Sequence, residues 1–176
     1  MKKLTTVFFL LLLSPIAAHA AGNKYQDSPI YFGVNYGNFK DLDSGPMIQV
    51  GYDFSDYLAV EGQVGAPNEK EGTVSGYPYT LRFTYASALV RGNLRFDRHT
   101  LFAYAGATYG KTDTKIDLGT STESDSTSET KPTYGFGIDL YGNNTTALTF
   151  KWMRVYDDTD GDIDATFLGI THYLSD

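Results

Sequence analysis

The chain has 176 residues, enough for one domain, and its 21 Asp and Glu outnumber its 14 Lys and Arg, giving a formal net charge of −7. An acidic chain does not bind nucleic acid by neutralising phosphates, so this class of partner is excluded. With no cysteine, the chain has no disulfides to stabilise it, whereas 15% aromatic residues and 18 glycines are typical of small membrane β-barrels.

The N-terminus has the pattern of a secretory signal peptide. Lys2 and Lys3 precede an apolar segment, residues 4–13, and Ala18-His19-Ala20 places small residues at a cleavage site. We therefore predict that residues 1–20 are removed after export.

The mature chain is predicted to have two parts, a short N-terminal periplasmic segment of residues 21–28 and an outer-membrane β-barrel domain of residues 29–176. Its 12 Lys and Arg against 21 Asp and Glu give a net charge of −9. No apolar run reaches the roughly 20 residues of a transmembrane helix, so we expect none.

From Pro29 onward, eight stretches rich in β-forming residues are joined by connections that are short and long in turn. This alternation is typical of a transmembrane β-barrel, whose two ends face different compartments. The short breaks lie near residues 54–56, 97–99 and 142–145, and the long ones near residues 38–44, 66–79, 112–131 and 156–162. With the N-terminus in the periplasm, the long connections face outside.

Apolar residues occupy every second position in most stretches. Because successive side chains of a strand point to opposite faces, one face is expected to contact lipid while the polar face lines the interior. The sequence thus predicts an all-β fold, an eight-stranded antiparallel up-and-down transmembrane β-barrel. Ile48, Val60, Ile138 and Phe150 are predicted to face outward, and Gln49, Glu61 and Lys151 inward.

Two stretches and one connection are less regular. The apolar parity changes within residues 80–96, which suggests a β-bulge or a strand that continues beyond the lipid. Within residues 100–111 we expect the alanine-containing parity to face outward. Residues 121–130 contain no apolar side chain, so the 112–131 connection is predicted to be a mobile loop.

Three segments carry a resemblance to a known family. They read Gly-Pro-Met-Ile-Gln-Val-Gly-Tyr-Asp-Phe at 45–54, Leu-Phe-Ala-Tyr-Ala-Gly-Ala-Thr-Tyr-Gly at 101–110 and Phe-Leu-Gly-Ile-Thr-His-Tyr-Leu at 167–174. The chain resembles small eight-stranded bacterial outer-membrane proteins, the group of outer membrane protein X, opacity-type adhesins and the barrel of outer membrane protein A. The resemblance implies residence in the outer membrane of a Gram-negative bacterium, insertion by the barrel assembly machinery, and surface or adhesion roles.

Charged residues recur on the inward-facing parity. An eight-stranded barrel is just wide enough for side chains to fill it, and charges there must pair or stay hydrated. We interpret them as an ion-paired plug that closes the lumen. The alternative is a narrow ion conduit. These residues are Asp53, Glu61, Arg91, Arg95, Asp139 and Lys151.

Residues 157–164 form an acidic segment with a partial calcium-loop spacing. The expected glycine and glutamate of such a loop are replaced by Ile163 and Gly169. We therefore predict an acidic outer loop and no metal site, although divalent cations could bridge the loop to lipopolysaccharide.

Catalysis would need a histidine beside a nucleophile near the outer rim. The mature chain has only His99 and His172, both predicted at the periplasmic end, with no serine placed to act with them. The sequence therefore predicts no enzyme and no cofactor.

Aromatic residues are predicted to form two girdles at the membrane interfaces. The turn-side group is Phe54, Tyr57, Phe96, Tyr141 and Tyr173, and the loop-side group is Tyr36, Phe83, Tyr109, Tyr134 and Tyr156.

The predicted role is structural or surface-interacting, carried by the barrel and its acidic loops. Outer-membrane lipid and lipopolysaccharide are the expected surroundings, and an extracellular ligand is possible. Two alternatives remain open at this stage: a narrow channel or carrier of small hydrophobic molecules, and a soluble lipocalin-like periplasmic barrel.

Overall fold

The computed structural model describes residues 28–119, 121–156 and 162–174, so the predicted signal peptide and nearly all of the predicted 21–28 segment lie outside it. The described residues form nine strands, and none of them belongs to a helix able to cross a membrane. The strands are β1 (Ile30–Phe39), β2 (Gly45–Ser55), β3 (Leu58–Gly65), β4 (Lys70–Val74), β5 (Tyr77–Phe96), β6 (His99–Asp117), β7 (Thr122–Tyr141), β8 (Thr146–Tyr156) and β9 (Ile163–Tyr173).

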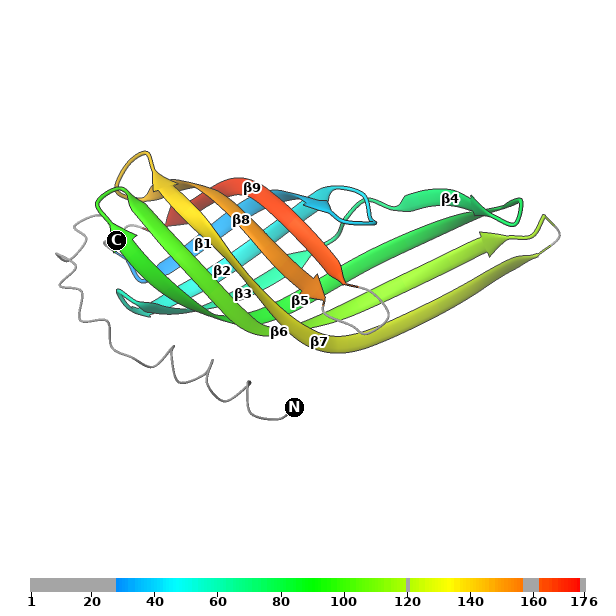
Figure 1. The fold of residues 1–176 in the computed structure, drawn as a ribbon, viewed down its shortest axis with the longest axis horizontal. Helices are drawn as coiled ribbons and strands as arrows, with labels where there is room; N and C mark the ends of the chain where they lie inside the picture. The colour runs from blue at the N-terminus through cyan, green and yellow to red at the C-terminus, as the bar shows by residue number, and fades with distance from the viewer. Residues whose placement is uncertain (1–27, 120, 157–161, 175–176) are drawn as a thin grey trace, which may run out of the picture.

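Eight of these strands close into a barrel. Sequential barrel strands pair antiparallel, β1 pairs with β9, and β3 pairs with β5 to complete the ring. The extra strand, β4, pairs only with the outer part of β5. The predicted eight-stranded antiparallel barrel is therefore confirmed (Figure 1).

The exposure of the side chains follows the predicted parity. Ile48 and Phe150 are 55% and 53% exposed, whereas Lys151 is 1% exposed. In β6, Leu101 points outward and Phe102 inward, so the alanine-containing parity does face outward. A soluble lipocalin-like barrel would bury the apolar parity, so this alternative is excluded.

The connections are sorted by length between the two ends of the barrel. The turns at residues 56–57, 97–98 and 142–145 lie at one end, which we call the turn end. The longer connections lie at the opposite, loop end (Figure 1).

A sheet projects from the loop end. β5, β6 and β7 contain 20, 19 and 20 residues, about twice as many as most of the other barrel strands. Since a strand rises about 3.3 Å per residue, ten extra residues extend roughly 30 Å beyond the barrel wall. Together with β4 they form a four-stranded projection, which we call the protruding sheet (Figure 1).

The prediction of a mobile 112–131 loop is wrong. β6 and β7 stay paired as far as Asp117 and Thr122, and the amide of Leu118 donates to the carbonyl of Ser121 at 2.9 Å. Residues 121–130 lack apolar side chains, yet the many Thr residues of the 112–131 segment favour strands, and β6 has a partner on each side. The predicted 66–79 connection likewise contains β4, which turns into β5 at Ser75 and Gly76, both with positive φ.

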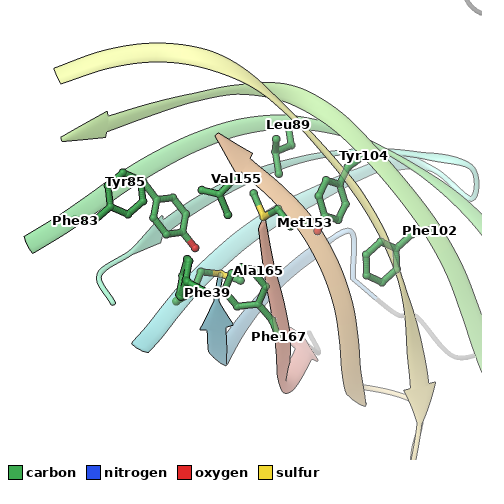
Figure 2. Close-up of a cluster of buried hydrophobic side chains, with 11 residues drawn as sticks. Phe39, Phe83, Tyr85, Leu89, Phe102, Tyr104, Met153, Val155, Ala165 and Phe167 are labelled. Carbon is green, nitrogen blue, oxygen red and sulfur yellow. The ribbon is translucent and has the colours of Figure 1, made fainter. Parts of the chain in front are cut away.

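Of the two explanations for the parity change in residues 80–96, the bulge is wrong, because β5 pairs with β6 without a register shift from Tyr79 to Phe96. The other, a strand that continues beyond the lipid, agrees with the 20 residues of β5. The apolar residues Phe83, Tyr85 and Leu89 instead point into the barrel near the loop end. There they join a buried apolar cluster with residues of β1, β2, β6, β8 and β9 (Figure 2). A Cβ at Gly65 would lie 2.4 Å from the Tyr85 ring, so glycine makes room for this ring.

The two predicted girdles are correct only in part. Phe83, Tyr141 and Tyr173 are buried inside the barrel, because they belong to the inward parity of their strands. The side chain of Tyr156 falls outside what the structure describes. The exposed members are Phe54, Tyr57 and Phe96 at the turn end and Tyr36, Tyr109 and Tyr134 toward the loop end.

Candidate functional site

Arg91 of β5 lies at the centre of a buried polar network in the barrel. One of its amino groups lies 3.4 Å from Glu61 Oε2 of β3, and the other donates to Asp139 Oδ2 of β7 at 2.5 Å. Its guanidinium also lies over the Phe102 ring, 3.8 Å from the centroid. Arg91 of β5 therefore connects the adjacent strand β3 with β7, two strands away on the other side, and its side chain is only 1% exposed.

Glu61 has hydrogen-bond donors on both carboxylate oxygens. The Tyr31 hydroxyl donates to Oε2 at 2.8 Å, and the Gln63 amide donates to Oε1 at 2.5 Å. Lys151 Nζ lies 3.6 Å from Oε1 and itself donates to Gln49 Oε1 at 2.5 Å. These partners compensate for the desolvation of the buried charges.

Asp139 completes this part of the network. Besides Arg91, it accepts a hydrogen bond from the Thr149 hydroxyl at 2.6 Å. The network then contains two cations, Arg91 and Lys151, and two anions, Glu61 and Asp139, so its formal charges cancel.

A second ion-paired group lies toward the turn end. Arg95 contacts Asp53 at 2.7 Å and Asp56 at 3.2 Å. Asn93 links the two groups, since it accepts from Arg91 Nε at 2.8 Å and donates to Asp53 at 3.3 Å. All six charged residues named from the sequence thus join one connected network.

Sequence reasoning placed Gln49 inward but named none of the neutral side chains as members of the network. Tyr31, Gln49, Gln63, Asn93 and Thr149 all lie on the inward parity of their strands, and this parity was the available signal. Which neutral side chain contacts which charged one depends on how the strands are staggered along the barrel axis.

Aromatic and apolar side chains lie on both sides of this network along the barrel axis. Most of the buried cluster of Figure 2 lies on the loop side, whereas its Phe102 ring packs against Arg91 itself. On the turn side the rings of Tyr31, Tyr141 and Tyr173 pack together, with centroids 5.1 Å and 6.2 Å apart. The inward-facing side chains are thus layered, apolar above and below a charged middle.

The two mature histidines lie at the turn end. His99 is exposed at the start of β6. His172 Nδ1 lies 2.9 Å from the Thr146 hydroxyl, and its ring packs on Phe32. Within the described ranges, no carboxylate hydrogen-bonds to this imidazole, and no group of three His, Asp or Glu could hold a metal ion.

The acidic segment 157–164 is described only from Asp162 onward, so most of the calcium-like spacing lies outside the described residues. Asp162 and Asp164 each contact Arg154 at 2.8 Å. These two carboxylates are therefore already paired with a cation.

The outward-parity face of the protruding sheet is polar. Arg82 pairs with Glu69, and Lys111 Nζ lies 3.0 Å from Asp113. Hydrogen bonds from Ser126 and Lys111 hold the pKa of Asp113 below its usual range. Arg82, Glu69 and Asp113 border a groove of about 450 Å³.

The family profile of the outer membrane protein beta-barrel domain matches residues 7–172. The chain belongs to this family. The protein accordingly resides in the cell outer membrane, as the sequence predicts. No curated protein sequence matches the chain.

Solved outer-membrane barrels share the fold. OprG of Pseudomonas aeruginosa is 9% identical, with 86% of this chain and 98% of that chain covered and a TM-score of 0.62. Ail, the attachment invasion locus protein of Yersinia pestis, is 19% identical, with 81% and 95% covered and a TM-score of 0.59. The barrel domain of Pseudomonas aeruginosa OprF is 13% identical, with 84% and 97% covered and a TM-score of 0.58. At these identities the likeness concerns the fold alone.

Proposed function

We propose that this protein is a non-enzymatic outer-membrane barrel with a closed lumen, which displays its protruding sheet outside the cell as an interaction surface. The lipid-facing wall contacts outer-membrane lipid and lipopolysaccharide, and the barrel assembly machinery inserts the chain. Two features observed together support the proposal. Charged and aromatic side chains fill the barrel interior, and a polar sheet extends beyond one end of the barrel.

Closure of the lumen is supported by the network around Arg91. Four charged side chains at 3% exposure or less meet in the middle of the barrel, with aromatic rings on both sides. An ion that crossed would have to separate these pairs in a low-dielectric interior, which is costly.

Display outside the cell is supported by the sorting of the connections. Outer-membrane barrels have short periplasmic turns and longer extracellular loops, so the loop end faces outward. The protruding sheet carries exposed Ser, Thr and charged residues, as expected for a solvated element. A structural neighbour, Ail, is described as an attachment invasion locus protein, which fits a surface role for this barrel architecture.

Planar-bilayer recording tests the closed lumen. We expect the purified, refolded protein to show no stepwise conductance in about 1 M salt, where a larger porin in the same bilayer gives clear steps. Reproducible single-channel steps from the wild-type protein would replace the closed scaffold with the narrow-channel alternative.

A further inference from the structure

One face of the protruding sheet continues the parity that lines the barrel interior, and we call it the inner face. In β5 this face carries Leu81, Tyr79 and Tyr77, in line with the buried residues lower in the strand. The strand register places Val74 of β4 opposite Tyr77, and Ile116 of β6 opposite Tyr79. Because residues opposite each other in neighbouring strands share a face, the inner face has an apolar patch over β4, β5 and part of β6.

This apolar patch is open to solvent. Val74 and Tyr77 are 54% and 45% exposed. The ring of Tyr79 lies over β4, since a Cβ at Gly72 would lie 2.5 Å from one of the ring carbons. Figure 1 shows the outer parts of β4 to β7 extending past the ends of the other strands, so those strands do not cover the patch. A contiguous apolar patch bordered by polar residues is typical of an interaction site.

Two carboxylates border the patch on β7. Glu123 lies opposite Ile116, and Asp125 lies opposite Thr114, so both belong to the inner face. Neither carboxylate takes part in an ion pair among the residues that the structure describes. Since neighbouring strands lie about 4.8 Å apart, the acids are roughly 10 Å from the apolar side chains of β5.

These dimensions fit a helix laid along β6. A sheet with one apolar face buries that face against another layer, and a helix is a common covering element. An α-helix with its side chains is about 10–12 Å wide, close to the distance from β5 to β7. Such a helix would rest its apolar stripe on Tyr79 and Ile116 and hold one flank over Glu123 and Asp125.

Charge decides which helix can occupy this position. Basic residues on the flank above β7 would be attracted to the two carboxylates, and acidic residues would be repelled. A second copy of the chain packed inner face to inner face would bring two acidic rows together, which disfavours self-association through this surface.

We propose that the inner face of the protruding sheet binds a cationic amphipathic helix, of the kind that lies on membrane surfaces. The apolar stripe of the helix packs on the patch, and its Lys or Arg residues contact Glu123 and Asp125. This deepens the proposed function and rests on it, since such a peptide reaches the inner face from outside the cell.

Two peptides of identical composition test the binding mode. Each has about 18 residues, half Leu and half Lys, and their order differs. In the first, Leu recurs with the period of a helix, and in the second Leu and Lys alternate with the period of a strand. Fluorescence anisotropy is measured with the barrel in zwitterionic lipid nanodiscs, and binding to empty nanodiscs is subtracted. We expect the helical peptide to bind about tenfold more tightly than the alternating one.

Two charge reversals locate the site. Glu123→Lys changes the inner face, whereas Glu71→Lys makes the same change on the opposite face, because Glu71 pairs with Thr80 on the parity of Arg82. We expect Glu123→Lys to weaken binding of the helical peptide about fivefold, and Glu71→Lys to weaken it less than about twofold. An equal loss in both variants would show attraction to the net charge alone and would overturn the site.

Three results with the wild-type protein would also overturn the proposal. Equal affinity for both peptides would mean that charge alone attracts them, and tighter binding of the alternating peptide would mean that the partner is extended. No binding beyond that to empty nanodiscs would mean that the inner face does not take such a helix. None of these results affects the closed lumen or its orientation in the cell, because the purified protein exposes both ends and bilayer recording tests closure separately.

Discussion

At the scale of single residues, Arg91 has the largest influence on the barrel interior. It contacts both buried carboxylates of the central network and hydrogen-bonds Asn93, which leads to the second group. Removing one partner of a buried ion pair is far more destabilising than the net contribution of the intact pair, because the remaining charge stays buried without compensation.

Arg91→Ala should therefore lower the free energy of unfolding by about 3–5 kcal/mol. Urea unfolding from lipid vesicles, followed by the fluorescence of the single tryptophan, Trp152, measures this change. Arg82→Ala removes an exposed, solvent-screened ion pair and should change the same quantity far less. Equal effects of the two substitutions would contradict the central position of Arg91.

The charged residues of the network could be predicted from the sequence, and their partners could not. Alternation alone places Glu61 and Lys151 on the inward face. Their contact across the barrel depends on the stagger between β3 and β8, which no local pattern encodes. The inward position of Phe83 was missed for a related reason, since an apolar residue near the loop end can face either the lipid or an apolar interior.

At the scale of strands, β6 and β7 extend beyond what alternation of apolar residues can predict. Alternation identifies a strand by apolar residues at every second position, and residues 121–130 have no apolar residue. Their order comes instead from the backbone ladder that continues from the barrel and from polar contacts such as the hydrogen bond between Asp113 and Ser126. The sequence therefore predicted the barrel strands and not the protruding sheet.

The protruding sheet should lose protection at acidic pH. The pKa of Asp113 lies below its ordinary value of 3.8 because Ser126 and Lys111 stabilise the carboxylate. A group with a lowered pKa in the folded state stabilises that state above its ordinary pKa, and the contribution is lost as the pH falls through the lowered value. Amide hydrogen exchange over residues 112–128, corrected for intrinsic rates, should show lower protection at about pH 3 than at about pH 6.

Asp113→Asn provides the control for this pH dependence. Its side chain does not titrate, so protection near residues 113 and 126 should already be reduced at neutral pH and should change less on acidification. A variant that loses as much protection as the wild type between the two pH values would show that another group controls the transition.

At the scale of the whole molecule, the two ends of the barrel differ in kind. One end has three tight turns, and the other carries a sheet that extends roughly 30 Å beyond the wall. The alternation of short and long connections predicted this asymmetry, because the length of a connection is visible in the sequence, whereas contacts between side chains are not. Outer-membrane residence and the asymmetry together give the molecule its proposed role as a closed support for an exposed surface.

The most direct test of this role is cysteine labelling on intact cells. Because the chain has no cysteine, a single introduced thiol reports its own position without background. Ser124→Cys marks the protruding sheet, and Asn144→Cys marks the turn between β7 and β8. Both positions are exposed. We predict that a membrane-impermeant maleimide labels the first variant on intact cells and the second only after the outer membrane is permeabilised. Labelling of the Asn144→Cys variant on intact cells, with the Ser124→Cys variant protected, would contradict the account.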